Sequence, residues 1–436
     1  MKILILGSGA REHAIAWKLA ESNSPTALYI APGNAGTLQI GENVELDYND
    51  FESVKAFCLA KKIEMVVVGP EEPLVKGIYD FFQQDESLRS IIITGPGAQG
   101  ARLEGSKAFA KAFMGRHGIP TAAYREFESS SFEEGVSYLT HHKLPVVLKA
   151  DGLAAGKGVV ICHDTKTAIA EFTAMIKELK FGDSGKKVVV EEFLDGTEIS
   201  MFACTDGEHY VMLPEAKDYK KIGEGDTGPN TGGMGAISPV PFATDTFKQK
   251  VIEKIVEPTI AGLKSEGIDY KGFLFFGLIK VNDEPFVIEY NCRLGDPETE
   301  VILLRIQNDF LELLSAMYVG KLDEIEMDIK KSVAATMVAV SKGYPGNYEK
   351  GKLIDFNYLK NPNAIKHMDE YGGAIVFQAG TIKRGEKTFT NGGRVLAVSS
   401  LTNALGESVE LSQEILQQIH FDGMYYRSDI GFEFLD

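Results

Sequence analysis

The stretch VVLKADGLAAGKGVVIC, residues 146–162, places two short apolar runs on either side of a loop rich in glycine and alanine. The runs Val146–Ala150 and Gly158–Cys162 have the length and the β-branched side chains of strands, so the sequence predicts a hairpin. The loop differs from a Walker loop, because it is one residue short between its glycines and lacks the Ser or Thr that binds a metal. It also joins two strands, whereas a Walker loop leads into a helix.

Lys149 ends the first of these strands, directly after the apolar run Pro145–Leu148. A lysine at the end of a buried strand usually has an anionic partner, because an unpaired buried charge is costly. Lys149 is suited to offset the charge of a triphosphate. Lys157 and the loop amides, among them the amide of Gly156, would act in the same way. Taken alone, the loop is also compatible with a mobile surface hairpin.

The first hundred residues alternate short apolar runs with helical patterns. The expected strands are Ile3–Leu6, Ala27–Ile30, Met65–Val68 and Ile91–Thr94, and the expected helices are Glu12–Ser22, Asp50–Lys61 and Pro73–Asp85. This alternation predicts a doubly wound α/β domain with parallel strands and crossover helices. Ligands of such domains bind at the carboxyl ends of the strands.

The first strand is followed by the turn Gly7-Ser8-Gly9-Ala10-Arg11-Glu12. Glu12 replaces the third glycine of a dinucleotide fingerprint, which disfavours a nicotinamide cofactor. The two glycines still permit backbone N–H groups to approach an anion at a helix N-terminus, where Arg11 and His13 would add positive charge. We therefore predict a phosphate cradle, with a simple tight turn as the alternative.

The rest of the chain divides into a small lobe, a larger sheet and a final α+β section. A helix from about Leu103 is followed by the hairpin, a helix near 167–179 and strands at 187–194 and 198–204. Residues 216–241 show no periodicity and are expected to form a long loop. The remaining expected elements are a hairpin of strands 273–281 and 285–291, a helix over 300–319, and strands 333–340, 375–379 and 394–398. We thus predict a multidomain α/β and α+β protein divided at 1–102, 103–326 (with a lid lobe at about 121–188) and 327–436.

Glu289 and Asn291 lie at the end of one expected strand, where alternation puts both side chains on one face. A carboxylate and an amide carbonyl are hard donors suited to magnesium, which keeps its other positions for water and nucleotide phosphates. Arg293 offers a planar fork for a carboxylate or phosphate, although a structural Glu–Arg pair is the plainer interpretation. Residues 226–235 form either a ligand loop with neutral Thr and Asn donors or a flexible linker.

Composition excludes several function classes. The 62 acidic and 45 basic residues give a formal charge of -17, which repels nucleic-acid backbones, so we expect no nucleic-acid partner. The four cysteines are scattered, without the spacing of a disulfide framework or a zinc site, as in a reducing compartment. The first apolar run is too short for a signal peptide and no run is long enough to span a membrane, so we expect a cytoplasmic protein. No Ser or Cys stands in a nucleophile motif with His.

The motifs, taken in order, are similar to those of the phosphoribosylamine–glycine ligase family of the ATP-grasp superfamily. The matching segments are Gly7–His13, Pro32–Gly36, Val68–Glu71, Lys149–Gly158, Gly228–Gly235, Asn291–Glu298 and Asn391–Val395. The resemblance implies an N-terminal α/β domain, an ATP-grasp unit of two lobes and a C-terminal domain. It further implies a monomeric enzyme of purine biosynthesis that joins glycine to 5-phosphoribosylamine through a glycyl phosphate, with ATP and Mg²⁺ or Mn²⁺.

The resemblance also implies roles for particular residues. The ATP site would comprise Lys107, Lys149, Gly156, Lys157, Glu191 with the Leu194 backbone at adenine, and Glu198 at the ribose. The substrate residues would be Gly9, Arg11, His13, Asn34, Glu71, Asn230, Thr231, Gly232, Arg293 and Asp296. Catalysis would depend on Lys149, Lys157 and Arg293, and the metal on Glu289 and Asn291.

This chain departs from the family pattern in two places. Tyr219 and Lys221 stand where a histidine and an arginine are common, which puts any role for those groups in doubt. Phe276 and Gly277 stand where many ATP-grasp enzymes carry a further acidic metal ligand. Two other functions stay open on the sequence: an ATP-grasp ligase for a different acid and amine, and a non-catalytic nucleotide-binding module.

Overall fold

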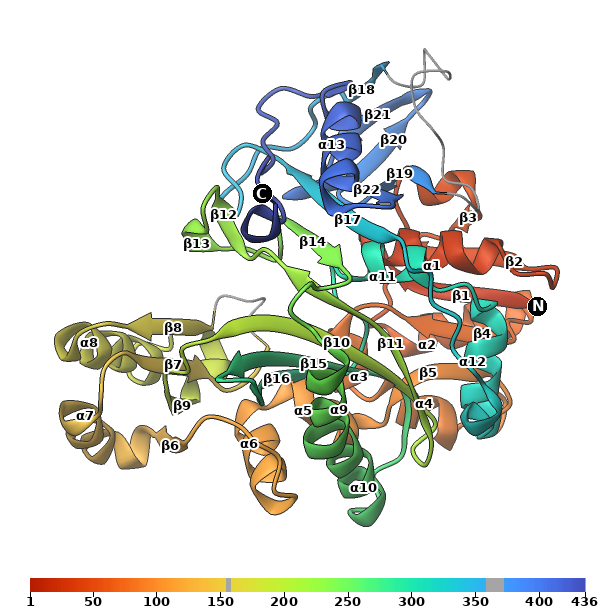
Figure 1. The fold of residues 1–436 in the computed structure, drawn as a ribbon. Helices are drawn as coiled ribbons and strands as arrows, with labels where there is room; N and C mark the ends of the chain where they lie inside the picture. The colour runs from red at the N-terminus through yellow and green to blue at the C-terminus, as the bar shows by residue number, and fades with distance from the viewer. Residues whose placement is uncertain (154–157, 358–371, 436) are drawn as a thin grey trace.

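The computed structural model describes residues 1–153, 158–357 and 372–435. Figure 1 shows four regions: the N-terminal part on the right, a lid lobe at the lower left, a central part between them and the C-terminal part at the top. A 13-stranded sheet runs through three of them, in the order β19-β22-β17-β14-β11-β10-β15-β5-β4-β1-β2-β3, with β16 paired to β15. Only the lid lobe has a separate large sheet.

The N-terminal part is doubly wound, as predicted. Strands β1 (Lys2–Gly7), β2 (Ala27–Pro32), β4 (Met65–Val68) and β5 (Ile92–Pro96) are parallel, with β1 between β2 and β4. Helices α1 (Ala10–Ala20) and α2 (Phe51–Lys61) match expectation. The single helix expected over 73–85 is wrong: α3 (Glu71–Val75) ends before α4 (Ile78–Gln84), because Gly77 takes a φ of +89° between them.

The lid lobe is an antiparallel sheet in the order β6-β9-β7-β8 with two helices on it. Its strands are β6 (Tyr124–Glu128), β7 (Val146–Ala150), β8 (Val159–Cys162) and β9 (Lys187–Glu192), and its helices are α7 (Phe132–His141) and α8 (Thr165–Ile176). The predicted hairpin is confirmed, with Val146 opposite Cys162 and Lys149 opposite Val159. A core of its own, centred on Phe127, Leu148 and Phe172, holds the lobe together.

The central part begins with two helices, α5 (Ala98–Gly105) and α6 (Lys107–Arg116), where Ser106 caps the second by accepting from the Phe109 amide. Its strands are β10 (Thr197–Thr205), β11 (Tyr210–Asp218), β15 (Tyr270–Val281) and β16 (Glu284–Asn291). Helices α9 (Asp245–Val251) and α10 (Glu257–Ser265) lie below them in Figure 1. The expected hairpin of β15 and β16 is confirmed by its pairing.

Two expectations for the later chain are wrong. Residues 216–241 are not a loop throughout, because they contain β12 (Lys221–Gly223), β13 (Thr227–Asn230) and the buried β14 (Gly235–Ser238), which pairs with β17 (Val333–Val340) about a hundred residues later. The helix expected over 300–319 is two helices, α11 (Thr299–Arg305) and α12 (Phe310–Val319). Asp309 starts the second by accepting from the amides of Leu311 and Glu312.

The C-terminal part completes the large sheet. The expected strands β19 (Gly373–Gln378) and β22 (Arg394–Thr402) are present, with β22 between β19 and β17. Helix α13 (Leu405–Leu416) packs on β17 and β22. Its smaller pairs are β20 (Thr381–Arg384) with β21 (Lys387–Thr390) and β18 (Asp355–Phe356) with β23 (Ile419–His420). In the described part of the chain, no helix has the length and apolar character needed to cross a membrane.

Candidate active site

Lys149 lies at the junction of the lid lobe and the central sheet. The residue is 4% exposed, and its Nζ is 3.0 Å from Glu191 Oε2 on β9. The same Nζ donates to the backbone oxygen of Ile288 on β16, at 3.0 Å. The anionic partner expected for this lysine is thus Glu191, and the lid lysine directly contacts the strand that carries Glu289.

Glu191 is nearly buried, and two lysines share one of its oxygens. Lys111 Nζ lies 3.1 Å from Oε2, in addition to Lys149. The other oxygen, Oε1, is buried and has no hydrogen-bond partner among the described residues. Leu194 lies three positions after Glu191, just beyond the end of β9. An unpaired buried acceptor is costly, so this corner of the site is suited to a ligand that donates a hydrogen bond.

Glu289 and Asn291 lie on one face of β16, as predicted, and both are half-buried. Within the described residues, neither side chain makes a hydrogen bond or an ion pair. Gly277 of β15 lies directly opposite Glu289, so the further acid of other ATP-grasp enzymes is absent here. Lys107 lies nearby on α6, where burial lowers its pKa and Glu289 acts in the opposite direction. The Lys107 Nζ donates to the Gly152 backbone oxygen at 2.9 Å.

Beside Glu289 is a small polar cavity of about 10 Å³. Its lining is Glu198, Ile199, Ser200, Asp218, Lys220, Gly277, Leu278, Ile288 and Glu289. The Lys220 ammonium pairs with Glu198 at 2.7 Å and lowers the pKa of that carboxyl. Burial raises the pKa of Asp218, whereas Asp218, Glu198 and Glu289 overcome burial and raise that of Lys220. Asp218 and Lys220 therefore belong to the site. In the sequence these two residues stand out only as neighbours of the glycine-rich segment 226–235.

Tyr219, the residue that departs from the family pattern, faces away from this cavity. Alternation along the chain puts Asp218 and Lys220 on the cavity side and Tyr219 on the other. The Tyr219 hydroxyl donates to Glu433 at 2.9 Å, and its ring lies 5.4 Å from the buried Arg427 guanidinium. The presence of tyrosine in place of the usual histidine thus affects the contact with the C-terminal part and not the cavity.

The N-terminal turn differs from the predicted phosphate cradle. The Gly9 amide donates to Glu12 Oε2 at 2.6 Å, so the carboxylate of the same helix occupies the amide that was expected to bind an anion. Glycine is needed here, because a Cβ at Gly9 or Gly69 would lie 2.8 or 2.0 Å from a Glu12 oxygen. Arg11 pairs with Glu12 at 2.6 Å. Burial would lower the pKa of Arg11, but Glu12, Asp296 and Glu71 outweigh it and raise that pKa.

The expectation that His13 adds positive charge is wrong. Burial lowers the pKa of His13 to about 4, and its Nδ1 accepts from the Gln378 amide at 2.8 Å. Asn34 is similarly engaged, because its Nδ2 donates to the backbone oxygens of Ser8 and Gln378 and its Oδ1 accepts from the Gly36 amide. Both side chains connect the N-terminal part to β19 of the C-terminal part.

Arg293 lies between two carboxylates. It pairs with Glu104 at 2.9 Å and with Glu71 at 3.5 Å, and its buried Nε has no hydrogen-bond partner in the described chain. Burial raises the pKa of Glu104, while Arg293 and Arg11 overcome burial and lower that of Glu71. The structure thus brings Glu71, Arg293 and Arg11 together across the N-terminal and central parts. Glu104 also belongs here, although the sequence had shown it only as a helical residue.

Asp296 and the glycine-rich segment are joined by Arg394 of β22. Arg394 contacts Asp296 Oδ1 at 3.1 Å and donates to the Gly232 backbone oxygen at 2.6 Å. Thr231 is buried and its hydroxyl donates to the Lys220 backbone oxygen, whereas Asn230 is exposed in β13. Arg394 stood in a matching motif, but nothing in the sequence showed which residues it contacts. The predicted Gly156 and Lys157 lie outside the described residues.

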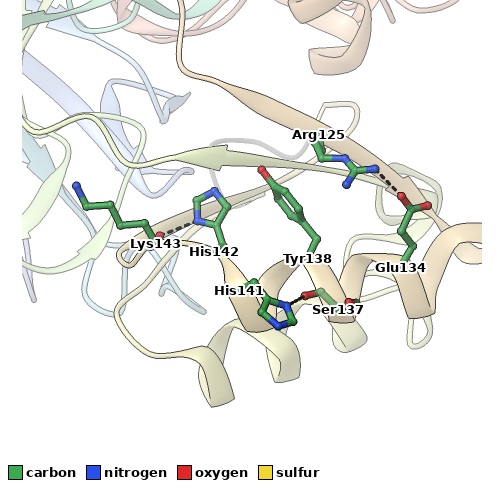
Figure 2. Close-up of a pocket in the computed structure, with 7 residues that line it drawn as sticks. All are labelled: Arg125, Glu134, Ser137, Tyr138, His141, His142 and Lys143. Carbon is green, nitrogen blue, oxygen red and sulfur yellow. Dashed lines mark hydrogen bonds and ion pairs between the residues drawn. The ribbon is translucent and has the colours of Figure 1, made fainter.

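A larger surface pocket, of about 420 Å³, lies on the lid lobe (Figure 2). It is lined by Arg125, Glu134, Ser137, Tyr138, His141, His142 and Lys143, all from β6, α7 and the residues that follow α7. Its polar groups bind one another: Arg125 pairs with Glu134, and His141 and His142 contact backbone oxygens. None of the candidate site residues lines this pocket, so it is separate from the site.

Comparisons with known proteins match all three parts of the chain. Models of phosphoribosylglycinamide synthetase match in order: its N domain over residues 1–104, its ATP-grasp (A) domain over 105–299 and its C domain over 334–433. The phosphoribosylamine–glycine ligase of Vibrio cholerae is 43% identical over 435 residues, or 99% of this chain and 98% of that protein. The Escherichia coli K12 enzyme is 42% identical over 100% of this chain and 99% of its own.

Solved structures agree with these matches. The phosphoribosylamine–glycine ligase of Thermotoga maritima superimposes with a TM-score of 0.82 at 35% identity, covering 99% of this chain and 100% of that one. The biotin carboxylase domain of the Hydrogenobacter thermophilus 2-oxoglutarate carboxylase, with a TM-score of 0.72 at 16% identity over 98% of this chain and 91% of that one, shares the fold alone. With relatives above 40% identity across nearly its whole length, the chain belongs to the phosphoribosylamine–glycine ligase family.

Proposed function

We propose that this protein is the ATP-dependent ligase that joins glycine to 5-phosphoribosylamine, giving glycinamide ribonucleotide, ADP and phosphate in purine biosynthesis. The observation that carries this proposal is the contact of Lys149 with both Glu191 and the backbone of Ile288. It sets a buried cation between a carboxylate with one free oxygen and the strand of Glu289 and Asn291. That arrangement suits a nucleotide held between the lid lobe and the central sheet.

Two steps account for the reaction. A glycine carboxylate oxygen attacks the γ-phosphorus of ATP, and the bond between that phosphorus and the β,γ-bridging oxygen breaks. ADP is the leaving group, and the product of this step is glycyl phosphate. The amine of phosphoribosylamine then attacks the glycyl carbonyl carbon, phosphate departs with the carboxylate oxygen, and the nitrogen loses a proton. Neither step needs a protein nucleophile, so the site acts by positioning and by offsetting charge.

On the nucleotide side, Lys107 and Lys149 would face the phosphates, with Lys157 and the Gly156 amide on the lid hairpin. Glu191 Oε1 would accept from the amino group of the base, with the Leu194 backbone beside it, and Glu198 would bind the ribose. Support comes from the unpaired buried Oε1 and from Lys107, where Glu289 opposes the lowering of the lysine pKa by burial and so favours its charged form.

Glu289 and Asn291 fit a divalent cation, because both present free oxygens on one strand face. Mg²⁺ or Mn²⁺ held there would neutralise phosphate charge during transfer. Since Gly277 supplies no third ligand, the remaining positions fall to phosphate oxygens and water. Asp218 lines the same cavity as Glu289, with its carboxylate 3.9 Å from the Lys220 ammonium.

On the substrate side, Arg293 and Arg11 would bind the phosphate or carboxylate groups, because both guanidinium groups lie beside Glu71. Asp296, held by Arg394, would accept from a substrate amine or hydroxyl next to Gly9, Asn230, Thr231 and Gly232. His13 and Asn34 would support this region through β19. We also propose domain divisions at residues 102 and 326, a monomer, and a cytoplasmic location.

ADP release with glycine, freshly generated phosphoribosylamine, ATP and magnesium, omitting one component at a time, tests the proposal. We expect release only with all four present, and a product of the mass of glycinamide ribonucleotide. ADP release that needs neither glycine nor phosphoribosylamine, or that occurs with another acid alone, would contradict it.

A further inference from the structure

Lys111 is a buried lysine that no step of the proposed reaction uses. It lies on α6 one turn beyond Lys107 and is 2% exposed. Its ammonium donates to Thr121 Oγ1 at 2.8 Å and to the Ala122 backbone oxygen at 3.2 Å, and it pairs with Glu191 Oε2 at 3.1 Å. An ammonium has three protons, and these three acceptors use all of them. Lys111 is therefore held in one position.

The contact is anchored on both sides of the junction between the lid lobe and the central part. Thr121, which precedes β6, donates in turn to the Val287 backbone oxygen on β16 at 2.7 Å. Glu191 lies on β9 of the lid sheet. Lys111 thus connects α6, the entry to the lid lobe and β9 without any ligand present.

The two lysines at Glu191 differ in what else they contact. Lys149 reaches Ile288 on the strand of Glu289, where phosphates would bind, so a nucleotide competes for its charge. Among the described residues, the Lys111 ammonium donates, besides Glu191, to the Thr121 hydroxyl and to the Ala122 backbone oxygen. Because both lysines share Oε2, Oε1 is left as a buried acceptor without a donor in the described chain. Lys111 would therefore remain on Glu191 if a nucleotide phosphate drew Lys149 away.

We propose that Lys111 is a positioning residue that holds one oxygen of Glu191 and thereby directs the other toward the amino group of the ATP base. The inference rests on the proposed function, in which Glu191 binds the base. It makes Lys111 a determinant of selectivity for a purine that carries a 6-amino group. A purine without this group leaves the aligned Glu191 oxygen buried and unpaired. Its binding is therefore weakened both by the missing hydrogen bond and by the cost of desolvating that oxygen.

The charges around Lys111 give the arrangement a pH dependence. Glu191 faces it from β9, Lys149 from β7 and the Tyr124 ring, 5.5 Å away, from β6. Glu192, the exposed neighbour of Glu191 on β9, adds a further negative charge that opposes the lowering of the Lys111 pKa by burial. Burial is the largest influence and lowers the pKa of Lys111 to about 8. The free enzyme thus loses this positive charge as the pH rises through about 8. An arginine in its place would stay charged.

The test compares kcat/KM for ATP with kcat/KM for purine riboside 5′-triphosphate, which lacks the 6-amino group. The enzymes are the wild type, Lys111→Met, Lys111→Arg, Glu191→Gln and a control, Arg116→Met. Arg116 lies on the same helix as Lys111, and its guanidinium pairs with Glu266 at the surface. Each ratio is measured at pH 7 and pH 9, with folding checked by circular dichroism. Comparing two nucleotides in one enzyme cancels effects that act on both.

We expect the ATP preference to fall about ten-fold in Lys111→Met, mainly through KM for ATP, and to be retained in Lys111→Arg and Arg116→Met. In the wild type it should fall several-fold from pH 7 to pH 9, whereas in Lys111→Arg it should not. Equal losses with both nucleotides in Lys111→Met would show a purely structural role and overturn the inference. If that variant does not fold, an unchanged wild-type ratio across pH 7–9 overturns it. An unchanged ratio in Glu191→Gln would instead remove the base assignment itself.

Discussion

Replacing Glu289 by glutamine tests the metal site with little disturbance to the fold. The substitution keeps the size of the side chain and removes one negative charge. In the described chain Glu289 has no hydrogen bond or ion pair to lose, and it is only half-buried at the end of β16. We therefore expect the free energy of unfolding to change by no more than about 1 kcal/mol.

The effect on catalysis should be much larger. If Glu289 holds the cation that offsets phosphate charge, its loss removes a single electrostatic stabiliser of the transition state. Such losses typically cost ~2.7–4 kcal/mol, or about 100- to 1000-fold in kcat. The assay is steady-state ADP release at saturating ATP, glycine and phosphoribosylamine over a range of magnesium concentrations. The apparent magnesium requirement should also shift to higher concentration.

Glu284→Gln is the matched control at the other end of the same strand. Glu284 pairs with Lys250 and Lys254 at the surface, so its loss should leave kcat within about two-fold of the wild type. Wild-type kcat in Glu289→Gln at low magnesium would refute the assignment. So would an equal loss in both variants, because the control lies outside the site.

Substitutions elsewhere separate the two substrates and test two buried groups. Arg11→Ala should raise the KM for phosphoribosylamine, and Lys149→Ala should raise the KM for ATP. Both KM values are measured by varying one substrate at a time. A loss of ATP affinity in Arg11→Ala would mean that the N-terminal turn binds the nucleotide. His13, with a pKa of about 4 when folded, should destabilise the protein as the pH falls from about 6.5 to 4, because the unfolded chain gains a proton that the folded chain does not. In urea unfolding, the stability of the wild type relative to His13→Gln should therefore fall by about 3 kcal/mol over this range, and a constant difference would show a charged ring. Glu300→Gln should change the free energy of unfolding at pH 7 by no more than about 1 kcal/mol, since burial raises the pKa of this carboxyl and neither of its oxygens has a partner in the described chain. A loss of several kcal/mol, measured by urea unfolding, would show that Glu300 is a charged member of an ion pair.

Local signals predicted most elements of the fold. The strands of the N-terminal part were found because they are short, apolar and buried on both faces, and the hairpin at 146–162 because two β-branched runs flank a glycine-rich loop. The single helix over 300–319 was wrong, although Asn308-Asp309 is a recognisable capping signal. The apolar pattern continues across this break and concealed it.

Elements that depend on distant partners were not predictable. Strand β14 is only four residues long and becomes a strand because β11 and β17 lie on either side of it. The same holds for the site. Lys111 is an ordinary helical lysine in the sequence, and its burial follows from the docking of β9 and the segment before β6. Periodicity records which face of a helix is apolar, but not where a charged side chain meets its partner.

Arg293 and His13 show the same limit. The fork of Arg293 was recognised from its position after Asn291, yet its partners Glu71 and Glu104 come from other parts of the chain. The charge expected of His13 was wrong, because burial lowers the pKa of its ring, and the strand it contacts, with Gln378, lies 365 positions away. Sequence spacing identified which residue types serve the chemistry, and the fold determined which of them remain free.

The central claim is that ATP activates the glycine carboxylate, and an isotope experiment tests it most directly. Glycine labelled with ¹⁸O in both carboxylate oxygens is converted with ATP and phosphoribosylamine, and the released inorganic phosphate is analysed by mass spectrometry. Because the phosphate departs from a glycyl phosphate with a carboxylate oxygen, we predict one ¹⁸O in each phosphate and one in the amide product. Unlabelled phosphate formed alongside the amide would contradict the account.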